Sequence, residues 1–134
     1  MTTGYSGTPL VRKLGIKAGH KVLFVNQPDH YLSLLDTLPE VMQATKTDQE
    51  VDFIHLFAPN YRTLDEHFQT CMSRLTKNGS LWVSWPKKAA KTATDLDSNV
   101  VRNYGLAQGL VDVKVCAVDE TWSALKFMYR VKDR

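Results

Sequence analysis

Two adjacent lysines follow an apolar run and a proline in the stretch from Leu81 to Lys88, which reads Leu-Trp-Val-Ser-Trp-Pro-Lys-Lys. Such a run is typical of a strand buried on both faces, and Pro86 ends it because proline cannot donate to a strand ladder. Lys87 and Lys88 therefore stand at the carboxyl end of the predicted strand. Two ammonium groups there suit an anion or a phosphate, and the alternative is a surface ion-pair cluster that closes a corner of the sheet.

Further polar and aromatic residues follow the other predicted strands. The carboxyl ends of parallel strands meet at one edge of an open α/β sheet, and ligands of such sheets bind there. We expect Trp85 or Trp122 to stack on a ligand, and Thr94 to lead into a helix whose N–H groups face it. The residues predicted to bind an anionic small molecule, or else a protein partner, are Asn26, Gln27, Asn60, Trp85, Lys87, Lys88, Thr94 and Trp122.

Asp119 and Glu120 lie in the turn after the last predicted parallel strand, so we expect them at the same edge. If the edge is catalytic, either carboxylate could act as the acid or base while a lysine holds the anion. If the edge only binds, the lysines alone carry the interaction. The residue types leave both possibilities open.

Other titratable residues are interpreted as structural. His55 lies inside an apolar strand, which favours a hydrogen-bonded core histidine over a base. Cys71 and Cys116 lie in apolar stretches without Cys-x-x-Cys spacing, and we interpret both as reduced core residues. The histidines show no metal-ligand spacing, so no metal site is predicted. No cofactor is predicted either. Lys126 interrupts an otherwise apolar strand face, and nothing in the sequence explains it.

Composition indicates one α/β domain over residues 1–134. The chain is 43% hydrophobic and 23% charged, as expected of a globular domain with one core. A net charge of +3 is small for a nucleic-acid-binding protein, which shows a denser basic face. No apolar run approaches the roughly 18 residues of a membrane span. We predict a cytoplasmic protein with no membrane association.

Hydrophobic periodicity places strands and helices in alternation. The predicted strands cover 22–25, 51–57, the run from Leu81, 110–118 and 122–131, with a short edge strand starting at 41–42. The predicted helices run from Thr8-Pro9 to Gly15, from Asp29 to Pro39, from Tyr61 to Leu75 with a cap at Lys77-Asn78-Gly79, and from a cap at Thr94, Asp95 or Asp97 to Gln108. This order predicts a doubly wound, Rossmann-like three-layer sandwich. Its mostly parallel sheet has five or six strands and a C-terminal antiparallel hairpin.

Two segments resemble class I S-adenosylmethionine-dependent methyltransferases. Residues 74–81, Arg-Leu-Thr-Lys-Asn-Gly-Ser-Leu, resemble their helix-to-strand junction, and residues 109–128 resemble their closing hairpin. The resemblance implies that the antiparallel strand lies between the last two parallel strands.

The cofactor half of that fold is shortened in this chain. The loop after the first strand, Asn26-Gln27-Pro28-Asp29, lacks the glycines that let the backbone approach a cofactor. Only residues 40–50 separate Pro39 from Val51, too few for the two strand-helix units that the full fold inserts there. We therefore expect a non-catalytic binding or regulatory module. The alternative is a small enzyme acting at the same edge.

The whole chain also resembles a family of small bacterial proteins known as a domain of unknown function. Three segments carry this resemblance: Gly-Tyr-Ser-Gly-Thr-Pro-Leu at 4–10, Leu-Trp-Val-Ser-Trp-Pro-Lys-Lys at 81–88, and Val-Asp-Val-Lys-Val-Cys-Ala-Val-Asp-Glu-Thr-Trp at 111–122. The family carries no assigned activity, so this resemblance implies none.

Overall fold

The computed structural model describes residues 8–134, and six strands form one sheet in it. Their bounds are β1 (Lys21–Val25), β2 (Met42–Gln43), β3 (Val51–Phe57), β4 (Leu75–Pro86), β5 (Leu110–Ala117) and β6 (Trp122–Tyr129). The strand order is β2-β1-β3-β4-β6-β5, with β2, β1, β3 and β4 parallel. The antiparallel β6 lies between β4 and β5, as the methyltransferase resemblance implies.

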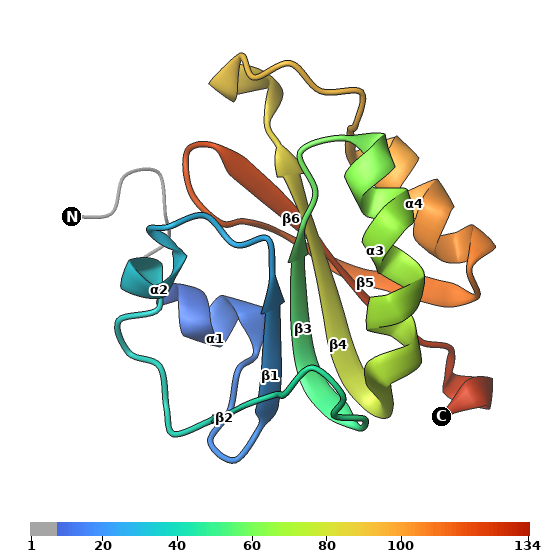
Figure 1. Ribbon diagram of the computed structural model, residues 1–134. Helices are drawn as coiled ribbons and strands as arrows, with labels where there is room; N and C mark the ends of the chain where they lie inside the picture. The colour runs from blue at the N-terminus through green and yellow to red at the C-terminus, as the bar shows by residue number, and fades with distance from the viewer. Residues whose placement is uncertain (1–7) are drawn as a thin grey trace.

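Helices cover both faces of the sheet (Figure 1). The helices α1 (Leu10–Leu14) and α2 (Tyr31–Leu34) lie on one face, and α3 (Tyr61–Arg74) and α4 (Ser98–Ala107) on the other. Two short 3₁₀ helices, η1 (Lys88–Ala90) and η2 (Val131–Asp133), follow β4 and β6. The sheet thus divides the interior into two apolar clusters, one under each helix pair. The predicted Rossmann-like α/β fold is confirmed.

The strand β3 has the predicted bounds because its residues are apolar on both faces. Every residue of β3 except Asp52 is buried, and α3 packs against it through Leu64, Phe68 and Cys71. Asn60 begins α3 as its N-cap, since its side chain accepts a hydrogen bond from the Thr63 N–H at 2.9 Å.

The expected cap at Lys77-Asn78-Gly79 is wrong. The helix α3 ends at Arg74, and residues 75–80 already belong to β4, a strand of 12 residues. A Cβ on Gly79 would come within 2.9 Å of the Asp52 carbonyl oxygen. Glycine is therefore required here for the close approach of β4 to β3, and not for ending a helix.

The first two helices are shorter or capped differently than expected. Pro9 occupies the N-cap of α1 and no side chain caps it, so the expected cap at Thr8 is wrong. Gly15 ends α1 with a left-handed φ of 80°, as predicted. Only Tyr31–Leu34 of the helix expected up to Pro39 is helical. The polar Asp36 and Thr37 favour turns, and proline disfavours helical geometry in the residue before it.

The remaining elements agree more closely with those predicted from the sequence. Asp97 is the cap of α4 and accepts from the Val100 N–H at 2.9 Å, which decides among the three candidate caps. The short β2 is an edge strand beside β1, and residues 44–50 link it to β3 through turns and irregular chain. The other sheet edge is β5, at the margin as expected.

Candidate functional site

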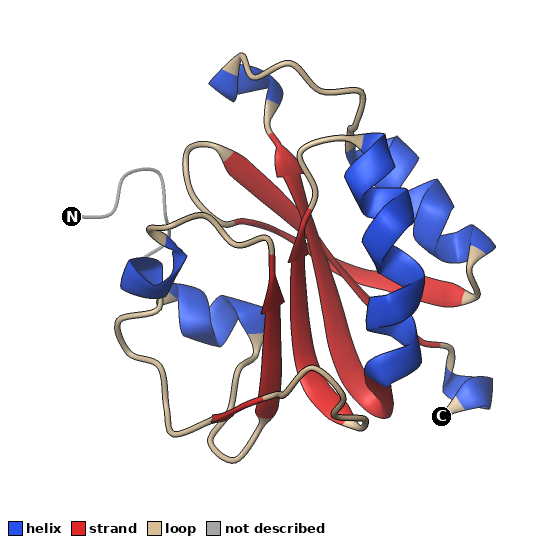
Figure 2. Cartoon of the chain, viewed as in Figure 1, coloured by secondary structure: helices blue, strands red, loops and turns tan. Residues whose placement is uncertain are grey.

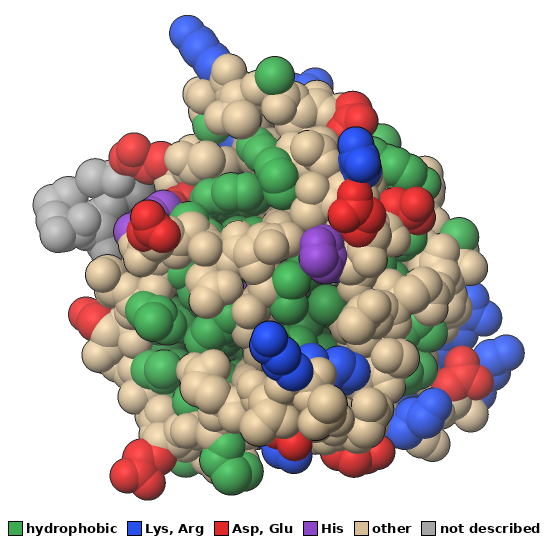
Figure 3. Space-filling model, viewed as in Figure 1, with side chains coloured by type: hydrophobic (Ala, Val, Ile, Leu, Met, Phe, Trp, Pro, Cys, Tyr) green, Lys and Arg blue, Asp and Glu red, His purple; other side chains and the backbone are tan. Residues whose placement is uncertain are grey.

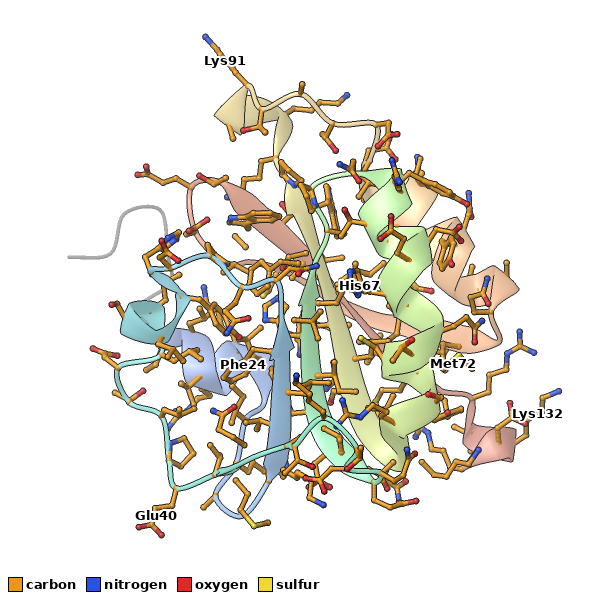
Figure 4. All side chains as sticks on the ribbon, in the orientation of Figure 1. Phe24, Glu40, His67, Met72, Lys91 and Lys132 are labelled. Carbon is orange, nitrogen blue, oxygen red and sulfur yellow. The ribbon has the colours of Figure 1, made fainter. Side chains whose placement is uncertain are left out.

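At the carboxyl edge of the sheet the exit of β4 meets the turn between β5 and β6, and we call the part of this edge that carries Lys87 and Lys88 the rim. The Lys87 backbone N–H donates to the Thr121 carbonyl oxygen at 2.8 Å. Lys87 is half-buried and Lys88 is exposed. Figure 2 shows the loops that leave the sheet at this carboxyl edge. Lys91 lies in the segment after β4, and its side chain extends away from the sheet (Figure 4).

Asp119 is held by three hydrogen bonds in this turn. Its Oδ1 accepts from the backbone N–H groups of Thr121 and Trp122, both at 2.8 Å, and its Oδ2 lies 2.7 Å from His30 Nε2. Burial opposes its ionisation, but the hydrogen bonds from His30 and the two N–H groups outweigh that effect and hold the Asp119 pKa below its usual value. Both oxygens are thus engaged in shaping the turn, whereas Glu120 is exposed.

His30 is a residue of this edge that sequence reasoning missed. It precedes α2 in the chain, and its side chain is 52% exposed beside Asp119. Its partner is 89 positions away in the sequence, so no local pattern could have indicated the pair.

The two tryptophans of the predicted site lie on opposite faces of the sheet. Trp122 is half-buried and makes an edge-to-face contact with Phe57, with ring centroids 5.2 Å apart. Trp85 is only 5% exposed and belongs to the apolar cluster under α3 and α4. The expectation that Trp85 stacks on a ligand is therefore corrected: β4 is buried on both faces from Leu81 to Pro86, and Trp85 enters the cluster on one of them.

Asn60 and Thr94 make local structural contacts. Asn60 caps α3, as described above. The Thr94 hydroxyl donates to the Pro59 carbonyl oxygen at 2.8 Å and accepts from the Leu96 N–H at 3.1 Å, so it ties the segment after β4 to the exit of β3. Asn26 and Gln27 are exposed after β1, and Asn26 has a left-handed φ of 59°.

Three buried polar side chains form a hydrogen-bonded row between α2 and the sheet. The Tyr31 hydroxyl lies 2.7 Å from His55 Nδ1, and the Ser84 hydroxyl lies 2.6 Å from His55 Nε2. All three residues are 0% exposed. Burial lowers the His55 pKa to about 3 and raises the pKa of Tyr31. His55 is thus the hydrogen-bonded core histidine that the sequence predicted. None of the three side chains is exposed for contact with a substrate.

The two thiols differ in burial. Cys71 is buried at 2% exposure in the cluster under α3, as predicted. Cys116 is only half-buried, at the margin of the cluster under α1, so the expectation of a core residue is met there in part. Both are free cysteines.

The methyltransferase resemblance implies a glycine after β1 and a carboxylate at the end of β2, and other residues stand at both places in this chain. The residue after β1 is Asn26, whose left-handed φ favours a glycine, but the loop contains none. The strand β2 ends at Gln43, and Ala44 follows, so neither offers a carboxylate for ribose hydroxyls. Within residues 8–134, no three His, Cys, Asp or Glu side chains group as metal ligands would.

Solved structures of methyltransferases share this fold. An S-adenosylmethionine-dependent methyltransferase from Aquifex aeolicus has a TM-score of 0.57 and 14% identity, over 90% of this chain and 87% of that chain. A protein described as a type 11 methyltransferase from Sulfolobus solfataricus has a TM-score of 0.63 and 14% identity, over 91% and 90%. An S-adenosylmethionine-dependent O-methyltransferase from Thermotoga maritima has a TM-score of 0.60 and 9% identity, over 100% and 69%.

These identities are low, so the likeness shows a methyltransferase-like fold and nothing about activity. No protein-family model and no curated protein matches the chain. The resemblance to the bacterial family of unknown function therefore stays a prediction. None of the helices that the structure describes is long and apolar enough to cross a membrane.

Proposed function

We propose that this chain is a non-catalytic binding or regulatory module that uses a shortened methyltransferase-like fold to recognise an anionic small molecule at its carboxyl edge. The observation that carries the proposal is the Lys87 N–H bond to the Thr121 carbonyl oxygen. It anchors the backbone beside the two lysines at the end of β4, where ligands of open α/β sheets bind. A backbone that is already fixed beside the two lysines loses less freedom on binding an anion than a mobile one does.

The arrangement around β1 argues against methyl transfer. The loop after β1 has no glycine, and β2 has only two residues. In addition, the contact between His30 and Asp119 joins the segment after β1 to the far side of the edge.

A ligand screen tests the proposal. Thermal unfolding is followed with pyrophosphate, nucleotides, phosphorylated metabolites and S-adenosylmethionine, and the double variant Lys87→Ala/Lys88→Ala is compared with Lys91→Ala. Lys91 is a matched control, because it lies in the same segment but extends away from the sheet (Figure 4). We expect at least one anion to raise the melting temperature of the wild type and of the Lys91 variant more than that of the double variant. An equal response in all three proteins would refute the role of the rim, and a large response to S-adenosylmethionine would refute the exclusion of that cofactor.

A small enzyme acting at the same edge is the second candidate, and the pair of His30 and Asp119 favours it. A half-exposed imidazole oriented by a carboxylate is the arrangement of a general base. In that case His30→Gln would abolish turnover of a ligand found in the screen while leaving its binding unchanged. A ligand that is bound and never converted would favour the binding module.

A further inference from the structure

Two lysines face each other directly on neighbouring strands. Lys114 of β5 is the register partner of Lys126 of β6, so both side chains lie on the same face of the sheet. The register shifts between Asp112 and Lys114, which leaves Val113 as the extra residue of a bulge. Without that bulge Val113 would stand opposite Lys126. The chain thus departs from a regular ladder in a way that creates a pair of like charges, which costs stability.

This pair lies on the face that α1 covers in part. On its other side Lys126 is the register partner of Trp82, whose indole N–H donates to the Leu14 carbonyl oxygen at 2.9 Å. Lys114 Nζ donates a hydrogen bond to the Lys13 carbonyl oxygen at 3.4 Å, so the carboxyl end of α1 lies beside it. Lys126 is half-buried, whereas Lys114 is exposed.

A third lysine joins the pair from the segment after α1. Burial, and then the positive charges of Lys114 and of the exposed Lys17, hold the Lys126 pKa below its usual value. Lys17 therefore lies close enough to Lys126 to affect its ionisation. We call Lys17, Lys114 and Lys126 the lysine cluster.

The ion pairs of the described chain lie elsewhere. They join His30 to Asp119, Arg62 to Glu66 and Arg102 to Asp112, and none includes a member of the lysine cluster. Residues 1–7, Met-Thr-Thr-Gly-Tyr-Ser-Gly, contain no Asp or Glu that could supply a counter-charge. On the side of the molecule that Figure 3 shows, acidic and basic side chains are interspersed.

We propose that the lysine cluster is a binding site for a phosphate group of a small anionic molecule. The bulge places Lys114 opposite the half-buried Lys126, and with Lys17 these lysines supply the point charges that a compact, multiply charged anion needs. A phosphate oxygen at Lys126 would offset the repulsion between Lys114 and Lys126. The inference is independent of the proposed rim function, because it uses other lysines on the face of β5 and β6.

Calorimetric titration with pyrophosphate tests this site. Lys126→Met removes the charge and keeps an apolar stem of similar length, and Lys114→Gln removes the opposing charge. Lys91→Gln is the matched control from a different part of the surface. We expect each cluster variant to bind pyrophosphate at least about tenfold more weakly than the wild type, while the control binds as the wild type does. Without ligand, the Lys126→Met variant should melt at the same temperature as the wild type or higher, because removing the Lys126 charge relieves its repulsion with Lys114.

Four results would overturn the proposal. The first is no binding of pyrophosphate by the wild type. The second is equal affinity in the wild type and Lys126→Met. The third is weaker binding only in Lys87→Ala/Lys88→Ala, which would place the anion at the rim and support the proposed function alone. The fourth is a preference for long oligonucleotides over pyrophosphate, which would indicate an extended nucleic-acid surface instead.

Discussion

His30 Nε2 lies 2.7 Å from Asp119 Oδ2, and this contact joins the segment after β1 to the turn between β5 and β6. In the sheet, β1 and β5 are separated by β3, β4 and β6. The contact therefore bridges the carboxyl edge of the sheet, and Asp119, which also accepts from two backbone N–H groups, is its central residue.

Asp119→Ala should destabilise the protein by about 1–3 kcal/mol, because it removes the acceptor of two backbone N–H groups as well as the partner of His30. Asp119→Asn keeps an oxygen for the two N–H groups and loses only the charge toward His30, so we expect a smaller loss. Urea denaturation of both variants measures the difference. Equal losses would contradict the view that the turn depends mainly on the backbone hydrogen bonds.

The stability of the protein should fall as the pH is lowered from 7 to 5, because His55 does not take up a proton in the folded state. Its pKa is about 3 when folded and about 6.5 when unfolded, so between these values the unfolded chain binds the extra proton. The His55 contribution at pH 5 amounts to about 2 kcal/mol of lost stability relative to pH 7. The lowered Asp119 pKa adds no slope in this window, because its stabilisation is complete above its unfolded value near 3.9 and is lost only as the pH falls further.

Urea denaturation of the wild type and of His55→Gln at both pH values measures this contribution. The variant is less stable at pH 7, because Tyr31 and Ser84 lose their shared partner. It should nevertheless lose about 2 kcal/mol less than the wild type on going to pH 5. The same pH dependence in both proteins would show that His55 is not the group responsible.

The sequence predicted those features that depend on local pattern. The continuous apolar run of β3 predicted both its bounds, and the common edge of parallel strands predicted that Lys87 would lie near the turn after β5. The left-handed Gly15 also follows from residue type and position, whereas Asp97 is one of three candidate caps among which only the structure decides.

Features that depend on tertiary contact could not be predicted in this way. The bulge at Val113 changes which side chain of β5 stands opposite Lys126, and strict alternation along β5 gives no sign of it. Gly79 resembles a helix stop in sequence, but its role depends on the distance from β4 to the Asp52 backbone. Lys126 is an exception among these features, because the sequence already shows a charged residue that interrupts an apolar strand face.

Trp82→Phe should loosen α1. The indole N–H of Trp82 donates to the Leu14 carbonyl oxygen, and its ring is fully buried between α1 and the sheet. We expect a loss of about 2 kcal/mol or more, and faster hydrogen exchange of the Gly15 and Ile16 amides that close α1. Trp85→Phe is the matched control, since Trp85 lies in the cluster on the other face. Equal acceleration of α1 exchange in both variants would contradict a specific role for the Trp82 hydrogen bond.

Gly105→Ala should destabilise the protein although it places alanine inside a helix. In an exposed helix this change stabilises by about 1 kcal/mol. Here a Cβ on Gly105 would overlap the ring of Phe127, which is 0% exposed beneath α4. The ring cannot move aside in a packed core, so we expect a net loss of about 1–3 kcal/mol.

A double-mutant cycle with Phe127→Leu separates this overlap from other effects. Phe127→Leu alone lowers stability by removing buried ring contacts, but it makes room for the new methyl group. In the Phe127→Leu background, Gly105→Ala should therefore cost much less than in the wild type, or become stabilising through helix propensity. Chemical denaturation of the four proteins gives the coupling energy. Additive effects would mean that α4 moves away from the sheet instead, and that Gly105 is not what sets their separation.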